Sequence, residues 1–361
     1  MHHLRQCKSE DIFSQMITDN PGEWCSRKDD ECPTDFYCYF VSDDEYSDPS
    51  IDEESSSDVE LQSTNNHQNS NINFTEIQSR GDPRNAEIYI EIIAELLQNE
   101  ESKHLIERGA IEKNYGNNFY QIRYKLGEWL FNLSSAYPST TETLFQAFSL
   151  FDRFLSKRIF PFQSLQLYCC CCLWICLKIE LHAEGTLEPL LSFCHNKFTR
   201  NNFINAELEI LSSVDYDINT VTSYFFVQRF IEQVEANKKM TLISKFLCES
   251  TLLYIDFSYF RPSLIGFCCV TVSCLIFQCP ERIMKLKGFA NNFSWNEVKR
   301  CFVKLINAGR KCSSNPKNAV FHKFTHLKIK NEPNMFIDLI KNINLEQQLI
   351  ESIALLFGHR I

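Results

Sequence analysis

Apolar residues recur at helical spacing along most of the chain that follows residue 84. Ile88, Ile92 and Leu96 lie four residues apart with acidic residues between them, a spacing that predicts an amphipathic helix. Five more such segments follow, without the alternation typical of strands, and a comparable series of five comes after them. The first series is Tyr120–Leu133, Thr141–Lys157, Phe162–Glu180, Glu188–Cys194 and Arg200–Ser213; the second is Val221–Glu235, Leu242–Phe257, Pro262–Phe277, Pro280–Leu286 and Ser294–Ala308.

The third helix of each series is apolar on nearly every side, which a helix tolerates when neighbouring helices surround it. Cysteines within these runs are interpreted as small hydrophobic residues that let helices approach closely, rather than as metal ligands or redox groups. Thr199 and Ser294 stand where N-caps are expected, and Pro262 stands in a first turn. The pattern therefore predicts an all-α protein with two tandem five-helix units.

The first 82 residues differ in kind from the rest. They contain 19 acidic and 5 basic residues, a net charge of 5 − 19 = −14, whereas the remainder contains 27 and 31, a net charge of +4. Such a segment buries too little apolar surface to offset chain entropy. The expected organisation is a disordered acidic tail at 1–82, an N-terminal helix and linker at 84–118, helical units at 119–218 and 219–312, and a basic, helical extension at 313–361.

Composition and motifs argue against several classes of protein. The 17 cysteines do not follow the spacing of a disulfide framework, and no signal segment is expected in Met1–Met16, so we expect a protein of the nucleus, the cytoplasm or both. The apolar runs Leu165–Ile179 and Leu264–Cys279 are shorter than the roughly 18–20 residues of a membrane span. No phosphate-binding glycine loop or metalloprotease motif occurs, so the sequence predicts a binding protein with no catalytic residues, metal or cofactor.

Four short motifs in the first unit occur in a fixed order. The segment Phe151–Ser156 contains Asp-Arg-Phe-Leu-Ser, and Leu165–Leu167 reads Leu-Gln-Leu. Leu177–Glu180 ends the central helix, and Val214–Ile218 follows the fifth helix. In order and spacing they resemble the "DRFLS", "LQL", "SKFEE" and "LTFDL" motifs of the cyclin box, and the likeness covers about 86–306. The second unit is similar to a second box only in its pattern.

The resemblance implies a regulatory subunit that binds and activates a cyclin-dependent protein kinase, in cell-cycle control, with the catalytic machinery in the kinase. The partner would be that kinase and, through it, the kinase's substrates; a membrane is not expected, and nucleic acid is disfavoured. One departure is Leu181, which stands where the family has a second acid. By likeness the kinase-binding residues are Lys178, Ile179, Glu180, Glu207, Leu211, Tyr216 and Ile218.

Periodicity alone favours Lys178 and Glu207 as solvated surface charges or helix-end pairs, and the motif series reverses that preference. Periodicity also predicts Ile204, Leu208 and Leu211 as the core stripe of the fifth helix. The resemblance also implies a structural pair, Arg123 with Asp152. Finally, it implies a degenerate form of the patch that many cyclins use to capture R-x-L peptides, at positions Ile122, Lys125, Leu126, Trp129, Asn132 and Gln166.

A second hypothesis is a cyclin-fold adaptor of the transcription-factor type that binds nucleic acid or a polymerase. Its support is the segment 282–330, which has 12 Lys and Arg against the single Glu297, a net charge of +11. The aromatic residues nearby are expected in the core, because Trp295, Val298, Phe302 and Leu305 share one helical stripe. This hypothesis gives Lys178 and Glu207 no evident role.

Overall fold

The computed structural model describes residues 96–97, 99–116, 119–135, 139–181, 187–194 and 197–326. The described residues from Glu100 onward belong to one compact unit. The predicted acidic tail, most of the helix at Ile88–Leu97 and the end of the C-terminal extension lie outside the described residues. The boundaries placed at 118, 218 and 312 stay predictions, and the last of them falls inside a helix.

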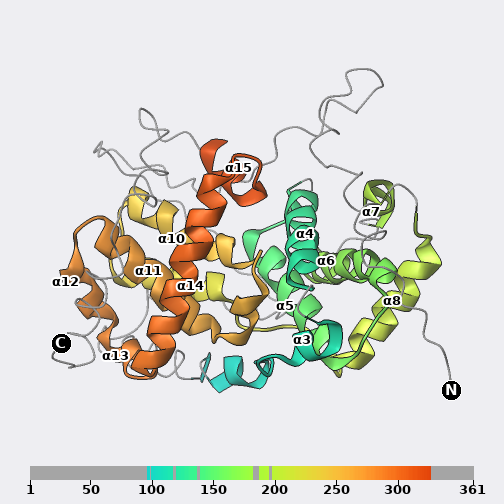
Figure 1. The fold of residues 1–361 in the computed structure, drawn as a ribbon, viewed down its shortest axis with the longest axis horizontal. Coiled ribbons are helices and arrows are strands. Elements are labelled where there is room, and N and C mark those ends of the chain that lie inside the picture. The colour runs from blue at the N-terminus through green and yellow to red at the C-terminus, as the bar shows by residue number, and fades with distance from the viewer. Residues whose placement is uncertain are drawn as a thin grey trace, which may run out of the picture. The chain divides into compact units, whose positions relative to one another are not determined.

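The described part of this unit, within residues 100–326, is helical and contains no strand (Figure 1). The short helix α3 (Ala110–Tyr115) comes before a first bundle with α6 at its centre, packed against α4, α5, α7 and α8. The bounds in this first bundle are α4 (Phe119–Ser134), α5 (Thr141–Lys157), α6 (Leu165–Leu181), α7 (Leu187–Phe193) and α8 (Arg200–Ser213).

The second bundle repeats this plan around α11. Its helices are α9 (Ser223–Gln233), α10 (Lys238–Thr251), α11 (Pro262–Ile276), the short α12 (Pro280–Ile283) and α13 (Lys287–Ala290), and α14 (Trp295–Ser314). The last described helix, α15 (Ala319–His326), packs against α4, α10 and α14, so it connects the two bundles. Two tandem all-α units are therefore confirmed.

Capping residues fix where several of these helices begin. Thr199 and Ser294 are the N-caps of α8 and α14, and each forms a capping box with the residue three positions later. Pro262 occupies the first turn of α11 as expected. At Gly266, helices α11 and α9 approach so closely that an added Cβ would lie 2.7 Å from Phe226 Cβ. A larger residue at this position would therefore push the two helices apart.

Two of the sequence expectations that were wrong concern the end of α10 and the length of the central apolar run. The helix expected at 242–257 ends at Thr251, and a 3-10 turn at Ile255–Tyr259 follows it. Hydroxyl groups explain this end, because Ser250 and Thr251 donate to the carbonyls of Phe246 and Cys248 and compete with the helix ladder. The length argument against a membrane span also fails, since Phe162–Glu180 is long and apolar enough to cross a membrane by length and composition. Burial among the other helices shows that this stretch serves as the core of the first bundle.

Candidate functional site

Lys178 and Glu207 meet at the surface between α6 and α8. Lys178 lies in the last turn of α6, and its Nζ forms an ion pair with Glu207 Oε1. The same Nζ lies 3.8 Å from the centroid of the Trp174 ring, so a cation–π contact also fixes the ammonium. The two side chains are 33% and 19% exposed, which leaves both within reach of a partner.

Apolar side chains surround this ion pair and face solvent. Ile179 is 41% exposed, Ile204 is 39% exposed and Leu208 is 57% exposed. The expectation that Ile204, Leu208 and Leu211 form the core stripe of α8 was therefore wrong. A helix with two apolar stripes can bury either one, and the stripe that α8 buries is Phe203, Ala206 and Ile210. We call Lys178, Ile179, Ile204, Glu207, Leu208 and Leu211 the α6–α8 face.

The loop after α8 presents Tyr216 next to this face. Asp215 and Tyr216 adopt positive φ angles of 54° and 61°, which non-glycine residues seldom do, and Tyr216 is 66% exposed. Arg153 fixes the position of the loop, because its guanidinium donates hydrogen bonds to the carbonyls of Asp217 at 2.6 Å and Ile218 at 3.3 Å. Burial lowers the pKa of Arg153, and the nearby Asp217 opposes that shift.

A second contact to the loop comes from the segment before α3. His104 Nε2 lies 2.7 Å from Asp217 Oδ2, and this hydrogen bond lowers the pKa of the Asp217 carboxyl. Sequence reasoning missed both His104 and Arg153 as positioning residues. Arg153 stands inside the recognised Asp-Arg-Phe-Leu-Ser segment, which could have drawn attention to it, whereas nothing in the sequence pairs His104 with a residue 113 positions away.

The remaining residues that the likeness assigns to a kinase contact are placed as follows. Glu180 accepts hydrogen bonds from the Thr140 backbone N–H at 3.2 Å and from the Thr143 hydroxyl, so its carboxylate supports the start of α5. Leu211, within the α6–α8 face, and Ile218, in the loop after α8, are both half-buried. The side chain of Leu181 lies outside the described residues.

Substitution Arg153→Gln is expected to loosen the Tyr216 loop. Losing two charge-assisted hydrogen bonds should lower the free energy of unfolding by about 2 kcal/mol and speed amide exchange at 214–218. Hydrogen exchange with mass spectrometry measures the local effect, and urea unfolding measures the global one. Arg158→Gln, an exposed arginine just beyond α5, is the matched control, and equal exchange in the two variants would contradict the role of Arg153.

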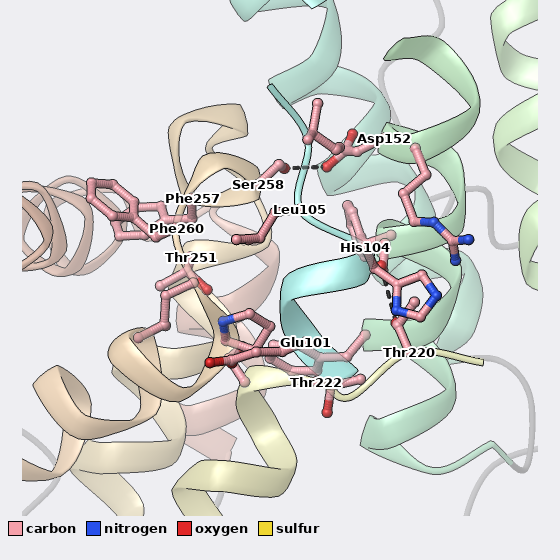
Figure 2. Close-up of a pocket in the computed structure, with 18 of the residues that line it drawn as sticks. Glu101, His104, Leu105, Asp152, Thr220, Thr222, Thr251, Phe257, Ser258 and Phe260 are labelled. Atoms are coloured by element: carbon pink, nitrogen blue, oxygen red, sulfur yellow. Dashed lines mark hydrogen bonds between the residues drawn. The ribbon is translucent and has the colours of Figure 1, made fainter. Parts of the chain in front are cut away.

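Arg123 and Asp152 form a buried pair between α4 and α5. Arg123 Nε and Nη2 donate to the two Asp152 oxygens at 2.7 and 3.0 Å, with side-chain exposures of 2% and 4%. Ser258, in the turn after α10, donates to Asp152 Oδ2 at 2.5 Å. Figure 2 shows this bond at a cavity that residues of both bundles and the 101–105 segment line. The pair thus supports the junction of the bundles.

The peptide-docking positions lie along α4 and at the start of α6. Lys125 and Asn132 are exposed, whereas Leu126 is only 5% exposed and belongs mainly to the core. Ile122, Trp129 and Gln166 are half-buried. The groove expected from the likeness would therefore have a cation at its surface and little free apolar area.

Within the described ranges, no group of three or more His, Cys, Asp or Glu side chains is placed to hold a metal ion. The cysteines in these ranges are free thiols, and nearly all are buried. Burial raises the pKa of Cys176 to about 12, so this thiol stays protonated at neutral pH and is a poor nucleophile. The presence of these cysteines is therefore explained by their packing between the helices.

Comparison with known proteins identifies two family matches that together cover both bundles. Residues 91–219 match "Cyclin, N-terminal domain" and residues 221–334 match "Cyclin, C-terminal domain". Among curated relatives, Cyclin-B2-1 of Oryza sativa subsp. japonica is 24% identical over 262 residues, which cover 71% of this chain and 62% of that protein. The chain thus spans about three fifths of the length of this relative.

Another relative and one solved structure complete the comparison. The G2/mitotic-specific cyclin-2 of Medicago sativa is 26% identical over 229 residues, which cover 62% of this chain and 69% of that protein. A viral cyclin from herpesvirus saimiri superposes with a TM-score of 0.46 at 20% identity, over 52% of this chain and 86% of that one.

Proposed function

The chain belongs to the cyclin family, and from that premise we propose that it binds and activates a cyclin-dependent serine/threonine protein kinase. The observation that carries the proposal is the α6–α8 face, where the Lys178–Glu207 ion pair stands among exposed apolar side chains. Interfaces of this kind combine apolar anchors with a few well-placed charges. In this proposal the chain acts as a regulatory subunit, and the kinase supplies the catalytic residues.

The mechanism is a shift in the conformational equilibrium of the kinase. A protein kinase is active when a lysine of its β-sheet pairs with a glutamate of its regulatory helix, and the position of that helix controls the pair. Ile179, Leu208 and Tyr216 pack against this helix in its inward position, and the ion pair opens to bind backbone groups at its ends. Because this face binds the active conformation better, kinase molecules accumulate in it.

A role in cell division is the biological setting that we propose, in the nucleus, the cytoplasm or both. The relative from Medicago sativa is named G2/mitotic-specific cyclin-2, which supports that setting. The substrates of the complex are those of the kinase.

The test is reconstitution with defined partners. The full-length chain is purified from its own cells, the co-purifying kinase is identified, and that kinase is expressed alone. Adding the chain at micromolar concentration should raise its activity toward a peptide substrate by orders of magnitude. A chain that raises the activity of neither this kinase nor a panel of recombinant cyclin-dependent kinases would refute the proposal and favour the adaptor hypothesis.

We also expect this protein to capture R-x-L peptides weakly. Lys125 places a cation near the peptide arginine, and Asn132 lacks the carboxylate that would pair with it. A charge-assisted hydrogen bond contributes about 1.5–3 kcal/mol, so Lys125→Ile with Asn132→Glu should tighten binding about 10- to 100-fold. Fluorescence anisotropy with a labelled peptide measures this.

Adding Gln166→Ala to the double variant is the control for location, and it should remove part of the gain. The alternative is that Lys125 extends its ammonium into solvent while its stem lines the groove. Tight binding by the wild type that the double change does not improve would contradict the prediction.

A further inference from the structure

The solvent-facing side of α14 is a continuous positive surface. Lys299, Arg300, Lys304 and Lys311 are exposed, and Arg310 is half-buried beside them. At 100° per residue these five side chains fall on one side of the helix, opposite the buried stripe of Val298, Phe302 and Leu305. We call these five cations the α14 face. Figure 1 shows α14 on the second bundle, away from α6 and α8.

Acidic neighbours neutralise only part of this charge. Lys304 Nζ lies 2.7 Å from Asp256 Oδ1 in a partly exposed ion pair. Glu297 completes the capping box at Ser294 and lies 3.6 Å from Arg261, and the charge of Arg300 also helps to lower the pKa of its carboxyl. Beside the Lys304–Asp256 pair, Lys299, Arg300 and Lys311 add three exposed cations, in a chain whose net charge is −10. Exposed ion pairs contribute little to stability, so Lys304 can exchange Asp256 for another anion.

The chemistry of the surface indicates which anion. The large exposed hydrophobic residues in the described part of the chain include none from α14, so a protein partner would find no apolar anchor there. Trp295 is half-buried, which offers no platform for stacking unpaired bases. Exposed Asn296 and Asn307 instead add amide donors between the cations, the combination that contacts sugar and phosphate.

We propose that the α14 face binds the phosphate backbone of double-stranded nucleic acid. From Lys299 to Lys311 the helix rises about 18 Å, at 1.5 Å per residue. A strand of duplex DNA winds around the axis as it advances about 3.4 Å per phosphate, so a straight helix of that length can lie along a few phosphates of one strand. The sequence disfavoured nucleic acid because that hypothesis gave Lys178 and Glu207 no role; the arrangement of the cations on one face of α14 separates this surface from that pair. This function is separate from kinase binding and uses none of the α6–α8 residues.

The test compares two variants that lose the same charge. Lys299→Gln with Arg300→Gln removes two cations from the α14 face, and Lys157→Gln with Arg158→Gln removes an exposed Lys-Arg pair at the end of α5. Binding of the full chain to a labelled 24-base-pair duplex is measured by anisotropy between 0.05 and 0.3 M salt. Each lost phosphate contact should reduce the steepness of the fall of log K with log salt by about 0.9. The slope of the α14 variant should therefore be about 1.8 less steep than that of the wild type.

At 0.1 M salt that change corresponds to roughly a 10- to 60-fold weaker affinity for the α14 variant. The α5 variant should stay within about threefold of the wild type, because its cations lie off the proposed surface. Equal losses in the two variants would show an effect of net charge alone and overturn the proposal. Absence of duplex binding at 0.05 M salt, or equally tight binding of a glutamate-rich peptide, would also overturn it.

Discussion

Replacing Lys178 and Glu207 together with alanine is expected to abolish measurable binding of the kinase and leave the fold intact. Truncating charged groups at the centre of an interface costs about 2–5 kcal/mol, so the dissociation constant should rise at least about 30-fold. The fold should survive because the pair is partly exposed, and such pairs contribute at most about 1 kcal/mol to stability. Biolayer interferometry measures binding, and circular dichroism melting measures the fold.

A matched control for this variant exists in the second bundle. Lys304→Ala with Asp256→Ala removes another partly exposed Lys–carboxylate pair, outside the α6–α8 face. This control should bind and activate the kinase like the wild type. If the Lys178 and Glu207 double variant activates the kinase at wild-type concentrations, the α6–α8 face is not the kinase contact.

Asp152→Ala is expected to be the most destabilising single change among these variants. It leaves the Arg123 guanidinium, whose side chain is 2% exposed, without its carboxylate, and it removes the acceptor for Ser258. Breaking a buried pair from one side typically costs about 3–5 kcal/mol. Urea unfolding followed by circular dichroism should show a lower midpoint with an unchanged slope, since the folded surface is the same.

A double substitution separates the cost of a stranded charge from the net contribution of the pair. Arg123→Met with Asp152→Leu replaces both charges by apolar groups, and such replacements are often neutral or even stabilising. The double variant should therefore be more stable than Asp152→Ala alone. Ser258→Ala should cost about 1 kcal/mol, the contribution of one hydrogen bond. A loss below about 1 kcal/mol for Asp152→Ala would show that Arg123 finds another partner or reaches water.

Sequence reasoning was most accurate where the deciding interactions are local. The bounds of α5 and α8, the N-caps at Thr199 and Ser294 and the proline at the start of α11 agree with expectation, because capping and periodicity depend on residues three or four positions apart. It failed at Thr251, where hydroxyl groups end a helix whose apolar pattern continues. Intrinsic periodicity carries no information about that competition.

The sequence by itself determined the all-α class, the duplicated five-helix plan and the positions of Lys178 and Glu207 as candidates. Only the tertiary structure decided which apolar stripe of α8 is buried, since Ile204 and Leu208 match the helical period as well as Phe203 does. Only packing joins Lys178 to Glu207 across 29 residues, and Arg153 to the loop carbonyls across 64. Helix formation follows from contacts within one turn, whereas a binding face exists only after separate helices have been fixed against one another.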